Sequence, residues 1–573
     1  MSRIQRVGRG VIVAIVALSG WAAIAAARPA TVAIQLLAFN DFHGHLEPPA
    51  GSNGRIGDTV AGGVEFLASH IAALKAANPR NTVVVSAGDN IGATPLISGL
   101  FHDEPAIESL NALGLQVSAV GNHELDEGWW ELRRMARGGC HPADGCQDGT
   151  PYRGARFAFL AANITVDASK VSRAHLKAAG WKGKGVQTLF PASTVRTVGG
   201  VKVGFIGLTL EGTPEIVMPS SLEGLTFHPE AAAANREVAR LRERGVRTIV
   251  VLIHEGGVPQ DSNPNGCTGL TGPIVPIAEA LSPDVDVVVS GHTHKSYVCT
   301  IAGKLVTSAE SYSRIVTDID LEVDRKTGDV VGKRARNVLA TRDVARDAAE
   351  TRLIDWYKPL ASKVADRQVG TVAASVTQAA NDAGETAMGQ MVADAMLEGS
   401  RDPASGGAEI AFTNSGGIRA ELTRATGAPE GQPTPVTFAM VSAVLPFGNV
   451  TVVKTLTGDA LVRLLEEQFD RPDGRPMMLQ VSQGFSYAFD PSKPPGQKVD
   501  RASVMVNGRL IGSADRVRVA SVDFVWNGGD RFTVVKEATD PTTVADVLDQ
   551  LIAYLGKHSP VSPGPRGRVR RIP

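Results

Sequence analysis

The sequence predicts an α/β protein in which two layered domains are joined by a helix, and three observations support this prediction. From residue 33 to about 324, short apolar runs rich in β-branched residues alternate with polar turns and helical stretches. A charged helical stretch follows, and a second set of strands and helices comes after it. A chain of 573 residues is also too long for one hydrophobic core, so two or three domains are expected.

We interpret the first residues as a secretory signal rather than as part of the fold. Arg3, Arg6 and Arg9 precede an apolar run over residues 11–18, and the alanines at 25–27 suit cleavage. This interpretation gives a signal peptide over residues 1–27. An uncleaved membrane anchor is the alternative, but the run is short for one. We therefore expect a periplasmic or secreted protein with no stable membrane insertion after cleavage.

The first domain is predicted over residues 30–340. Its strands are expected at 34–39, 82–86, 117–120, 157–161, 201–207, 248–253 and 285–290, with helices at 63–77 and 231–244 between them. Because these strands are almost wholly apolar, the sheet should be buried on both faces. The later runs 305–308 and 317–323 are expected to finish the sheet as antiparallel strands.

A linker helix is predicted over residues 341–366, and a second α/β domain over 367–573. The elements expected in this domain are a helix at 385–398, a strand at 410–413, a helix at 458–469 and a strand at 517–522. The net charge is −1, so the chain has no overall basic field that would attract a nucleic acid polymer.

Polar residues follow five of the first-domain strands, each beside a glycine. They are Asp41 and His43 after the first strand, then Asp89, Asn122, His254, and finally His292 with His294. Ligands bind at the carboxyl ends of strands in open α/β sheets, so these residues should converge. Oxygen and nitrogen ligands without sulfur suit Zn, Mn, Fe, Co or similar divalent ions. Seven ligands are enough for two ions if one carboxylate bridges them. Any one of them alone could equally be a turn or cap residue.

The motifs Asp-x-His, Gly-Asp, Gly-Asn-His-Glu, His and Gly-His-x-His, in this order, resemble the calcineurin-like metallophosphoesterases. Their spacing resembles the secreted 5′-nucleotidase branch, which includes bacterial UDP-sugar hydrolases and cyclic-nucleotide phosphodiesterases. The resemblance covers nearly all of the mature chain. It implies a first domain with a β-sheet sandwich flanked by helices and a C-terminal nucleotide-binding domain.

The resemblance also implies roles for individual residues. Asp41, His43, Asp89 and His294 would hold one metal, and Asp89 would bridge to a second metal held by Asn122, His254 and His292. Some relatives carry Gln at the position of His294, which leaves the preferred metal open. His123 and Asp126 match a catalytic pair, in which the imidazole faces the transferred phosphate. Glu124 is expected to support the turn, and His45 matches no ligand position.

In the second domain, Asn414 and Arg419 flank a glycine pair after a strand, where backbone and guanidinium could approach a phosphate. Phe447 and Phe524 stand beside glycine-rich turns and could either sandwich a planar base or merely fill loops. The resemblance implies the sandwich, with Asn414 and Arg419 contacting substrate and Asp530 binding ribose hydroxyls. Residues 381–386 lack the arginine that relatives often carry there, which disfavours a UDP-sugar substrate.

The four cysteines are expected to form disulfides, because an even count is typical of exported chains. Cys140 and Cys146 share a short loop, and Cys267 and Cys299 would be the second pair. A cysteine metal site is the alternative, but no Cys-x-x-Cys occurs.

We expect a two-metal hydrolase of nucleoside 5′-monophosphates that acts on a small nucleotide. A 2′,3′-cyclic-nucleotide phosphodiesterase/3′-nucleotidase, a UDP-sugar hydrolase and a sulfur-ester hydrolase are the alternatives among enzymes. An exported nucleotide- or metal-binding protein without turnover is the alternative of another class. The oligomeric state is not predicted.

Overall fold

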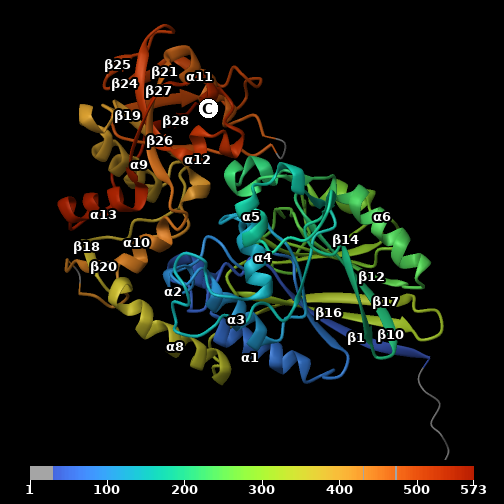
Figure 1. Cartoon of the computed structure of the whole chain (residues 1–573). Helices are drawn as coiled ribbons and strands as arrows, with labels where there is room; N and C mark the ends of the chain where they lie inside the picture. The colour runs from blue at the N-terminus through green and yellow to red at the C-terminus, as the bar shows by residue number, and fades with distance from the viewer. Residues whose placement is uncertain (1–29, 430, 472–473, 573) are drawn as a thin grey trace, which may run out of the picture.

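The computed structural model describes residues 30–429, 431–471 and 474–572. Figure 1 shows two α/β parts joined by helix α8 (Ala348–Ala365). The predicted signal peptide lies outside the described residues. Within them, no helix combines the length and the apolar character needed to cross a bilayer.

Two six-stranded sheets form the centre of the first part. The first has the order β17-β16-β1-β4-β5-β6, and the second β14-β15-β13-β12-β10-β9. The strands of the first sheet are β1 (Thr31–Phe39), β4 (Thr82–Ser86), β5 (Val117–Ala119), β6 (Ala158–Leu160), β16 (Ile315–Asp324) and β17 (Val330–Leu339). Those of the second are β9 (Ser193–Val198), β10 (Val201–Thr209), β12 (Thr248–His254), β13 (Val287–Ser290), β14 (Ser296–Ile301) and β15 (Lys304–Ala309).

Both faces of each sheet are buried at its central strands, which explains their continuous apolar runs. Ile34 and Leu36 of β1 lie in the same buried cluster as Phe205 of β10, between the sheets. Leu37 and Phe39 face the other way, into a cluster with the covering helices. These helices are α1 (Val64–Lys75), α2 (Leu96–Gly99), α3 (Glu104–Leu113) and α4 (Trp129–Arg137); α6 (Glu230–Glu243) and α7 (Ile274–Ala280) cover the second sheet. Smaller elements of this part are α5 (Arg173–Ala178), β2 (Arg55–Ile56), β3 (Thr59–Val60), β7 (Ile164–Asp167), β8 (Val186–Thr188) and β11 (Leu225–Phe227).

One predicted strand is wrongly placed. Residues 317–323 lie in β16 and pair antiparallel with β1, as expected. Residues 305–308 lie in β15, which belongs to the second sheet and runs parallel to β13. Since strands of both sheets are buried on both faces, their apolar runs look alike and cannot show which sheet each strand joins.

Helix α8 packs against the first part as well as connecting the two. The side chain of Asp347 caps its first turn by accepting hydrogen bonds from the amides of Ala349 and Glu350. Ile354 and Tyr357 are buried in the cluster that covers the first sheet. The linker is therefore anchored along one face.

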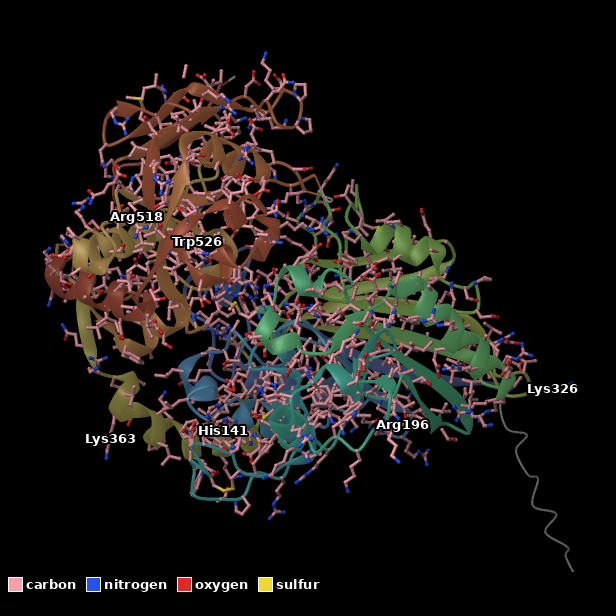
Figure 2. All side chains as sticks on the ribbon, turned by 45° about the horizontal axis from the view of Figure 1, so that its top comes forward. His141, Arg196, Lys326, Lys363, Arg518 and Trp526 are labelled. Carbon is pink, nitrogen blue, oxygen red and sulfur yellow. A yellow bond between two sulfur atoms is a disulfide. The ribbon has the colours of Figure 1, made fainter. Side chains whose placement is uncertain are left out.

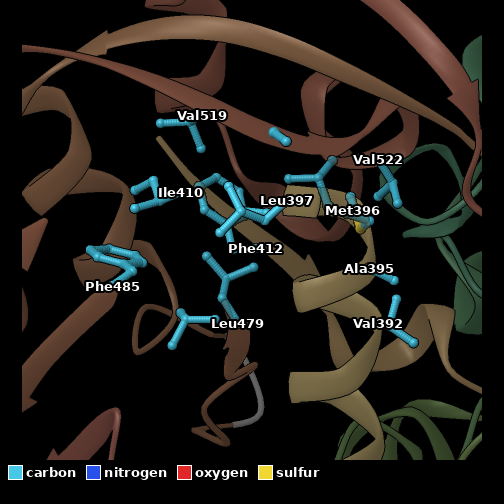
Figure 3. Packing of buried hydrophobic residues seen from close by; sticks show 14 of the residues in the cluster. Val392, Ala395, Met396, Leu397, Ile410, Phe412, Leu479, Phe485, Val519 and Val522 are labelled. Atoms are coloured by element: carbon cyan, nitrogen blue, oxygen red, sulfur yellow. The ribbon is translucent and has the colours of Figure 1, made fainter. Parts of the chain in front are cut away.

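The second part is built around a five-stranded sheet of order β22-β19-β26-β21-β27 and a four-stranded sheet of order β25-β24-β23-β28. Figure 3 shows its core, where Leu397 of α9 lies beside Phe412 of β19. The helices are α9 (Ala387–Ser400), α10 (Phe438–Val444), α11 (Gly458–Glu467), α12 (Asp523–Trp526) and α13 (Val547–His558). The strands are β18 (Gln368–Val372), β19 (Ile410–Asn414), β20 (Thr434–Thr437), β21 (Val450–Thr457), β22 (Leu479–Val481), β23 (Phe485–Phe489), β24 (Val499–Val506), β25 (Arg509–Leu510), β26 (Arg516–Val522), β27 (Thr539–Asp546) and β28 (Val569–Arg571).

The cysteines form the two disulfides that were expected. Cys140 is bonded to Cys146, and Cys267 to Cys299. The second bond ties the loop after β12 to strand β14, so it links the segments that follow His254 and His294.

Candidate active site

The seven candidate ligands all lie where strands end. Three strands of the first sheet deliver Asp41 with His43, Asp89 and Asn122, and two strands of the second sheet deliver His254 and His292 with His294. Six of these side chains form two groups, Asp41–His43–His294 and Asp89–His254–His292. Within each group the ligand atoms lie within 4.8 Å of one another.

Asp89 faces both groups. Its Oδ2 atom is 3.0 Å from Nε2 of His254 and 3.6 Å from Nε2 of His43. In the first group, Nε2 of His294 lies 3.2 Å from Asp41 Oδ1 and 3.2 Å from His43 Nε2. A single carboxylate therefore stands between the two sets of ligands.

Asn122 belongs to the second group. Its side-chain oxygen lies 3.1 Å from Nδ1 of His292, and Asn122 is buried. An amide oxygen and an imidazole nitrogen meet here.

The backbone at these residues is unusual. Five of the seven have left-handed conformations: φ is 51° at Asp41, 47° at His43, 51° at Asp89, 70° at His292 and 50° at His294. Such conformations cost about 1–3 kcal/mol each for residues other than glycine and cluster at functional sites. Because the backbone turns sharply at these residues, their side chains point toward the same metal-binding groups.

Close packing of the strand ends also explains a glycine beside the ligands. A Cβ atom at Gly121 would lie 2.1 Å from Asp89 Oδ1 and 2.5 Å from the Asp89 amide nitrogen. Any other residue at this position would push the two turns apart.

The tautomers of two histidines suit metal binding. His43 donates from Nδ1 to the carbonyl of Gly92 at 2.8 Å, and His254 donates from Nδ1 to that of Ala87 at 2.9 Å. Each ring thus presents Nε2 to the site, the arrangement typical of metal-ligating histidines. Nε2 of His254 is buried and faces Oδ2 of Asp89 at 3.0 Å.

The charges of the site also fit divalent cations. Burial lowers the pKa of His43 well below its usual range and that of His292 to about 3, so both rings are neutral and able to bind metal. Burial opposes ionisation of Asp41 and Asp89, but the neighbouring histidines outweigh it and lower the pKa of both carboxyls. His254 differs from these two rings: burial alone would lower its pKa, but the carboxylates of Asp89 and Asp41 raise it to about 10, so an ion bound there has to displace a proton from this ring. Buried carboxylates and imidazoles together make a donor set for Zn, Mn, Co or a similar ion.

Glu124 holds the turns together, which agrees with the supporting role expected of it. Its carboxylate accepts hydrogen bonds from the amides of Gly121 at 2.6 Å, Asp89 at 2.9 Å and Asn90 at 2.7 Å. Burial and the charge of Asp89 raise the pKa of Glu124 to about 7. The His45 ring packs against Tyr312 at a tilt of 40°, with ring centroids 4.1 Å apart, and joins neither group.

His123 and Asp126 form a hydrogen-bonded pair. Nδ1 of His123 lies 2.8 Å from Oδ2 of Asp126, and its amide donates to Asp89 Oδ1 at 2.9 Å. Burial alone would lower the pKa of His123, but the carboxylates of Asp126 and Asp89 raise it above its usual value. The imidazole therefore tends to hold a proton beside the proposed ligands.

A cavity of about 250 Å³ lies between the two parts of the molecule. One side, the first wall, consists of Asn122, His123, Asp126, Ile216, Val217, Met218 and His292. The opposite side, the second wall, consists of Asn414, Gly416, Gly417, Arg419, Phe447, Asn449, Met477, Phe524 and Asp530. All five residues predicted to bind substrate thus face the predicted catalytic pair.

Hydrogen bonds and ring contacts order the second wall. Asn414 donates from Nδ2 to Oδ2 of Asp530 at 2.6 Å. The Phe524 ring lies over Gly529, where a Cβ atom would come within 2.5 Å of it. The Phe447 ring stacks on His123, with centroids 5.6 Å apart and planes at 19°. The second wall therefore reaches the catalytic pair directly.

Sequence reasoning missed several residues. Asn40 donates from Nδ2 to Asp41 Oδ2 at 2.5 Å, and its place beside Asp41 was a usable signal. The apolar residues Ile216, Val217 and Met218 line the cavity from a loop after β10, and nothing in their pattern distinguishes them from core residues.

Comparison with known proteins agrees with this geometry. Residues 34–296 match the model of the calcineurin-like phosphoesterase family, and residues 365–537 match that of the 5′-nucleotidase C-terminal domain. The cell wall protein Lmo0130 of Listeria monocytogenes is 30% identical over 553 residues, which cover 92% of this chain and 67% of that protein. The chain belongs to the 5′-nucleotidase family of calcineurin-like phosphoesterases.

Two further relatives define how far the likeness extends. The 5′-nucleotidase precursor of Thermus thermophilus has a solved structure with a TM-score of 0.74 and 27% identity, covering 94% of this chain and 99% of that one. Endonuclease YhcR of Bacillus subtilis is 29% identical over 474 residues, but the match covers 82% of this chain and only 35% of YhcR. Family membership confirms the predicted fold class and the predicted enzyme class, a metal-dependent phosphoester hydrolase.

Proposed function

We propose that this chain is an exported phosphoesterase with two divalent metal ions that hydrolyses nucleoside 5′-monophosphates to nucleoside and phosphate. The observation that carries the proposal is the cavity between the two parts. Its first wall holds groups suited to phosphate chemistry, and its second wall holds groups suited to a nucleoside.

In this proposal Asp41, His43, Asp89 and His294 hold one ion, and Asp89, Asn122, His254 and His292 hold the other. Divalent ions bound there supply positive charge to a phosphoryl group and activate a water molecule. The chain itself positions five of these side chains through left-handed backbone, and the hydrogen bonds of Glu124 hold the turns at Asp89 and Gly121 together.

His123 acts as the proton-carrying group. Asp126 accepts the hydrogen bond from Nδ1, which fixes the ring and leaves Nε2 for the substrate. A protonated ring next to the phosphate stabilises negative charge in the transition state and can donate a proton to the leaving oxygen. The raised pKa of His123 keeps it in the required form.

The second wall recognises the nucleoside. Phe447 and Phe524 offer ring faces for the base, and Asp530 with Asn414 offers polar atoms for the ribose hydroxyls. Arg419 is the one arginine among the described residues that line the cavity, which favours a monophosphate over a sugar nucleotide. Residues 381–386 contain no arginine. There, the side chain of Asn381 donates a hydrogen bond of 2.8 Å to the side chain of Glu385, so these two polar groups pair with each other.

The proposed organisation is a signal peptide at 1–27, a metallophosphoesterase domain at 30–340, a linker helix at 341–366 and a substrate-binding domain at 367–573. Export is supported by the signal-like first residues and by the relative described as a cell wall protein. The expected partner is a small nucleotide rather than a nucleic acid polymer.

A substrate panel tests the proposal. Purified protein, treated with chelator and then supplied with Mn, Co or Zn, is assayed for phosphate release from AMP, GMP, CMP and UMP. A 2′,3′-cyclic nucleotide, a UDP-sugar and single-stranded DNA serve as competing substrates. We expect the 5′-monophosphates to give the highest kcat/KM and the chelated protein to be inactive. Preference for another substrate class, turnover without metal, or no turnover at all would contradict the proposal.

A further inference from the structure

A third cluster of metal-binding side chains lies outside the cavity. His141 and Asp144 stand in the turn closed by the Cys140–Cys146 disulfide. The backbones of His141 and Gly145 exchange hydrogen bonds of 3.2 and 2.9 Å, which fixes this turn. Figure 2 labels His141 near the lower edge of the molecule, away from Trp526 of the second part.

His102, from the segment between α2 and α3, completes the cluster. Its Nε2 lies 2.7 Å from Oδ2 of Asp144, and Nδ1 of His141 lies 3.2 Å from the same oxygen. Nδ1 of His141 also accepts a hydrogen bond of 3.2 Å from the Asp144 amide, which a bound ion would have to replace. The three ligand atoms are within 4.8 Å of one another. Ligands at about 2.0–2.1 Å from a tetrahedral zinc ion stand about 3.3 Å apart, so these spacings fit a metal site.

Nδ1, the second ring nitrogen of His102, lies beside a carboxylate, as the second nitrogen of a metal-binding histidine commonly does. Nδ1 of His102 lies 3.3 Å from Oε2 of Glu127, which orients the ring so that Nε2 faces Asp144. A carboxylate behind a ligating histidine fixes the tautomer and strengthens the ligand. The rings of His102 and His141 are stacked with centroids 3.7 Å apart and planes at 16°. Because the lone pair of a ring nitrogen lies in the plane of its ring, one ring must turn before both can bind the same ion.

We propose that His102, His141 and Asp144 bind one divalent transition metal ion, such as Zn²⁺, at a site separate from the cavity. The ion would link the disulfide-closed turn to the segment between α2 and α3. Since Glu127 directly follows Asp126, the site also supports the end of the loop that carries the catalytic pair. Both histidine side chains are four-fifths buried, whereas Asp144 is half exposed and leaves room for a water ligand.

A metal-free ion-pair cluster is the competing explanation. The hydrogen bond to Glu127 raises the pKa of His102 to about 9, against the effect of burial, and Asp144 and Glu131 add to this rise. A metal ion must therefore displace a proton from His102.

The test is the number of zinc ions bound per chain. Full-length mature protein is equilibrated with Zn²⁺, freed of excess metal and measured by elemental analysis, with the double variant His102→Ala/His141→Ala in parallel. We expect the double variant to bind one ion fewer than the wild type. The difference in zinc content between the wild type and the double variant does not depend on how many ions bind at the cavity. The variant Asp89→Ala measures the ions at the cavity separately.

His175→Ala is the matched control. Nδ1 of His175 lies 2.6 Å from Oε2 of Glu223, and its ring stacks on Trp130 at 3.5 Å. Among the described residues no further ligand completes a metal site around this pair. We expect this variant to bind as much zinc as the wild type.

Asp144→Asn provides a second variant if the double alanine variant does not fold, since it preserves the shape of the half-exposed side chain. We expect it to lose the same single ion, or to bind it at least about tenfold more weakly. Equal zinc content and affinity in the wild type and in the folded variants would overturn the proposal and leave a cluster of ion pairs.

Discussion

The two walls of the cavity are built in different ways. The polar residues of the first wall lie directly after buried strands, or within the turn that follows one. His292 has left-handed backbone, and Glu124 accepts a hydrogen bond from the amide of Gly121, the residue before Asn122. The residues of the second wall come from four separate segments, around Asn414, Phe447, Met477 and Phe524. Rigid placement suits phosphate chemistry, which needs accurate geometry, whereas stacking tolerates any planar base. The comparison predicts that changes to the two walls should have separable effects on catalysis.

The largest effect is expected from Asp89→Ala. Its carboxylate lies beside ligands of both groups, so its loss should empty or disorder the whole metal centre. The several kcal/mol that metal ions contribute correspond to about a 10³-fold or greater loss of kcat/KM. The kcat/KM for AMP and that for p-nitrophenyl phosphate should fall by similar factors, and elemental analysis should show less bound metal. Asp530→Asn on the second wall should keep its metal; a fully active Asp89→Ala would refute the two-metal proposal.

How much of this could be predicted differs between the metal-binding groups and the second wall. Asp41, His43, Asp89, His254, His292 and His294 were recognised because each follows an apolar strand at the end where ligands bind. The roles of Asn414, Arg419, Phe447, Phe524 and Asp530 rested on the family resemblance, since each alone could fill a loop. Ile216, Val217 and Met218 gave no signal, because an apolar residue in a loop looks the same whether it lines a cavity or a core.

The fold shows a similar limit. Apolar runs predicted the strands well, but they could not assign residues 305–308 to the second sheet, because both sheets are buried on both faces. The cluster of His102 and His141 was also missed. These residues stand 39 positions apart and come together only because the disulfide-closed turn packs beside the segment between α2 and α3.

The next largest effect is expected from His123→Ala. This residue lies on the first wall but holds a proton rather than a metal in our account. Loss of one such group should lower kcat by roughly 100-fold or more for both substrates. Elemental analysis should find the metal content unchanged. If the variant instead loses its metal, His123 is a ligand and the proposed division of roles on the first wall is wrong.

Asp126→Asn should have a smaller effect and a distinct signature. The carboxylate of Asp126 raises the pKa of His123, so its removal should lower that pKa. Activity that needs the protonated ring is lost as pH rises through this pKa. The alkaline limb of the pH profile of kcat should therefore move to lower pH in the variant. A limb that stays in place would show that the titrating group is not His123.

The most direct test of the two-wall account compares AMP with p-nitrophenyl phosphate in Phe524→Ala and Phe447→Ala. Stacking is worth about 1–3 kcal/mol per base, so each variant should raise KM for AMP about tenfold while hydrolysis of p-nitrophenyl phosphate changes little. GMP, UMP and CMP should behave as AMP does, and the melting temperature should stay near that of the wild type. Parallel loss of both activities together with a lowered melting temperature would mean that the rings only fill space, and would contradict a second wall that holds the base.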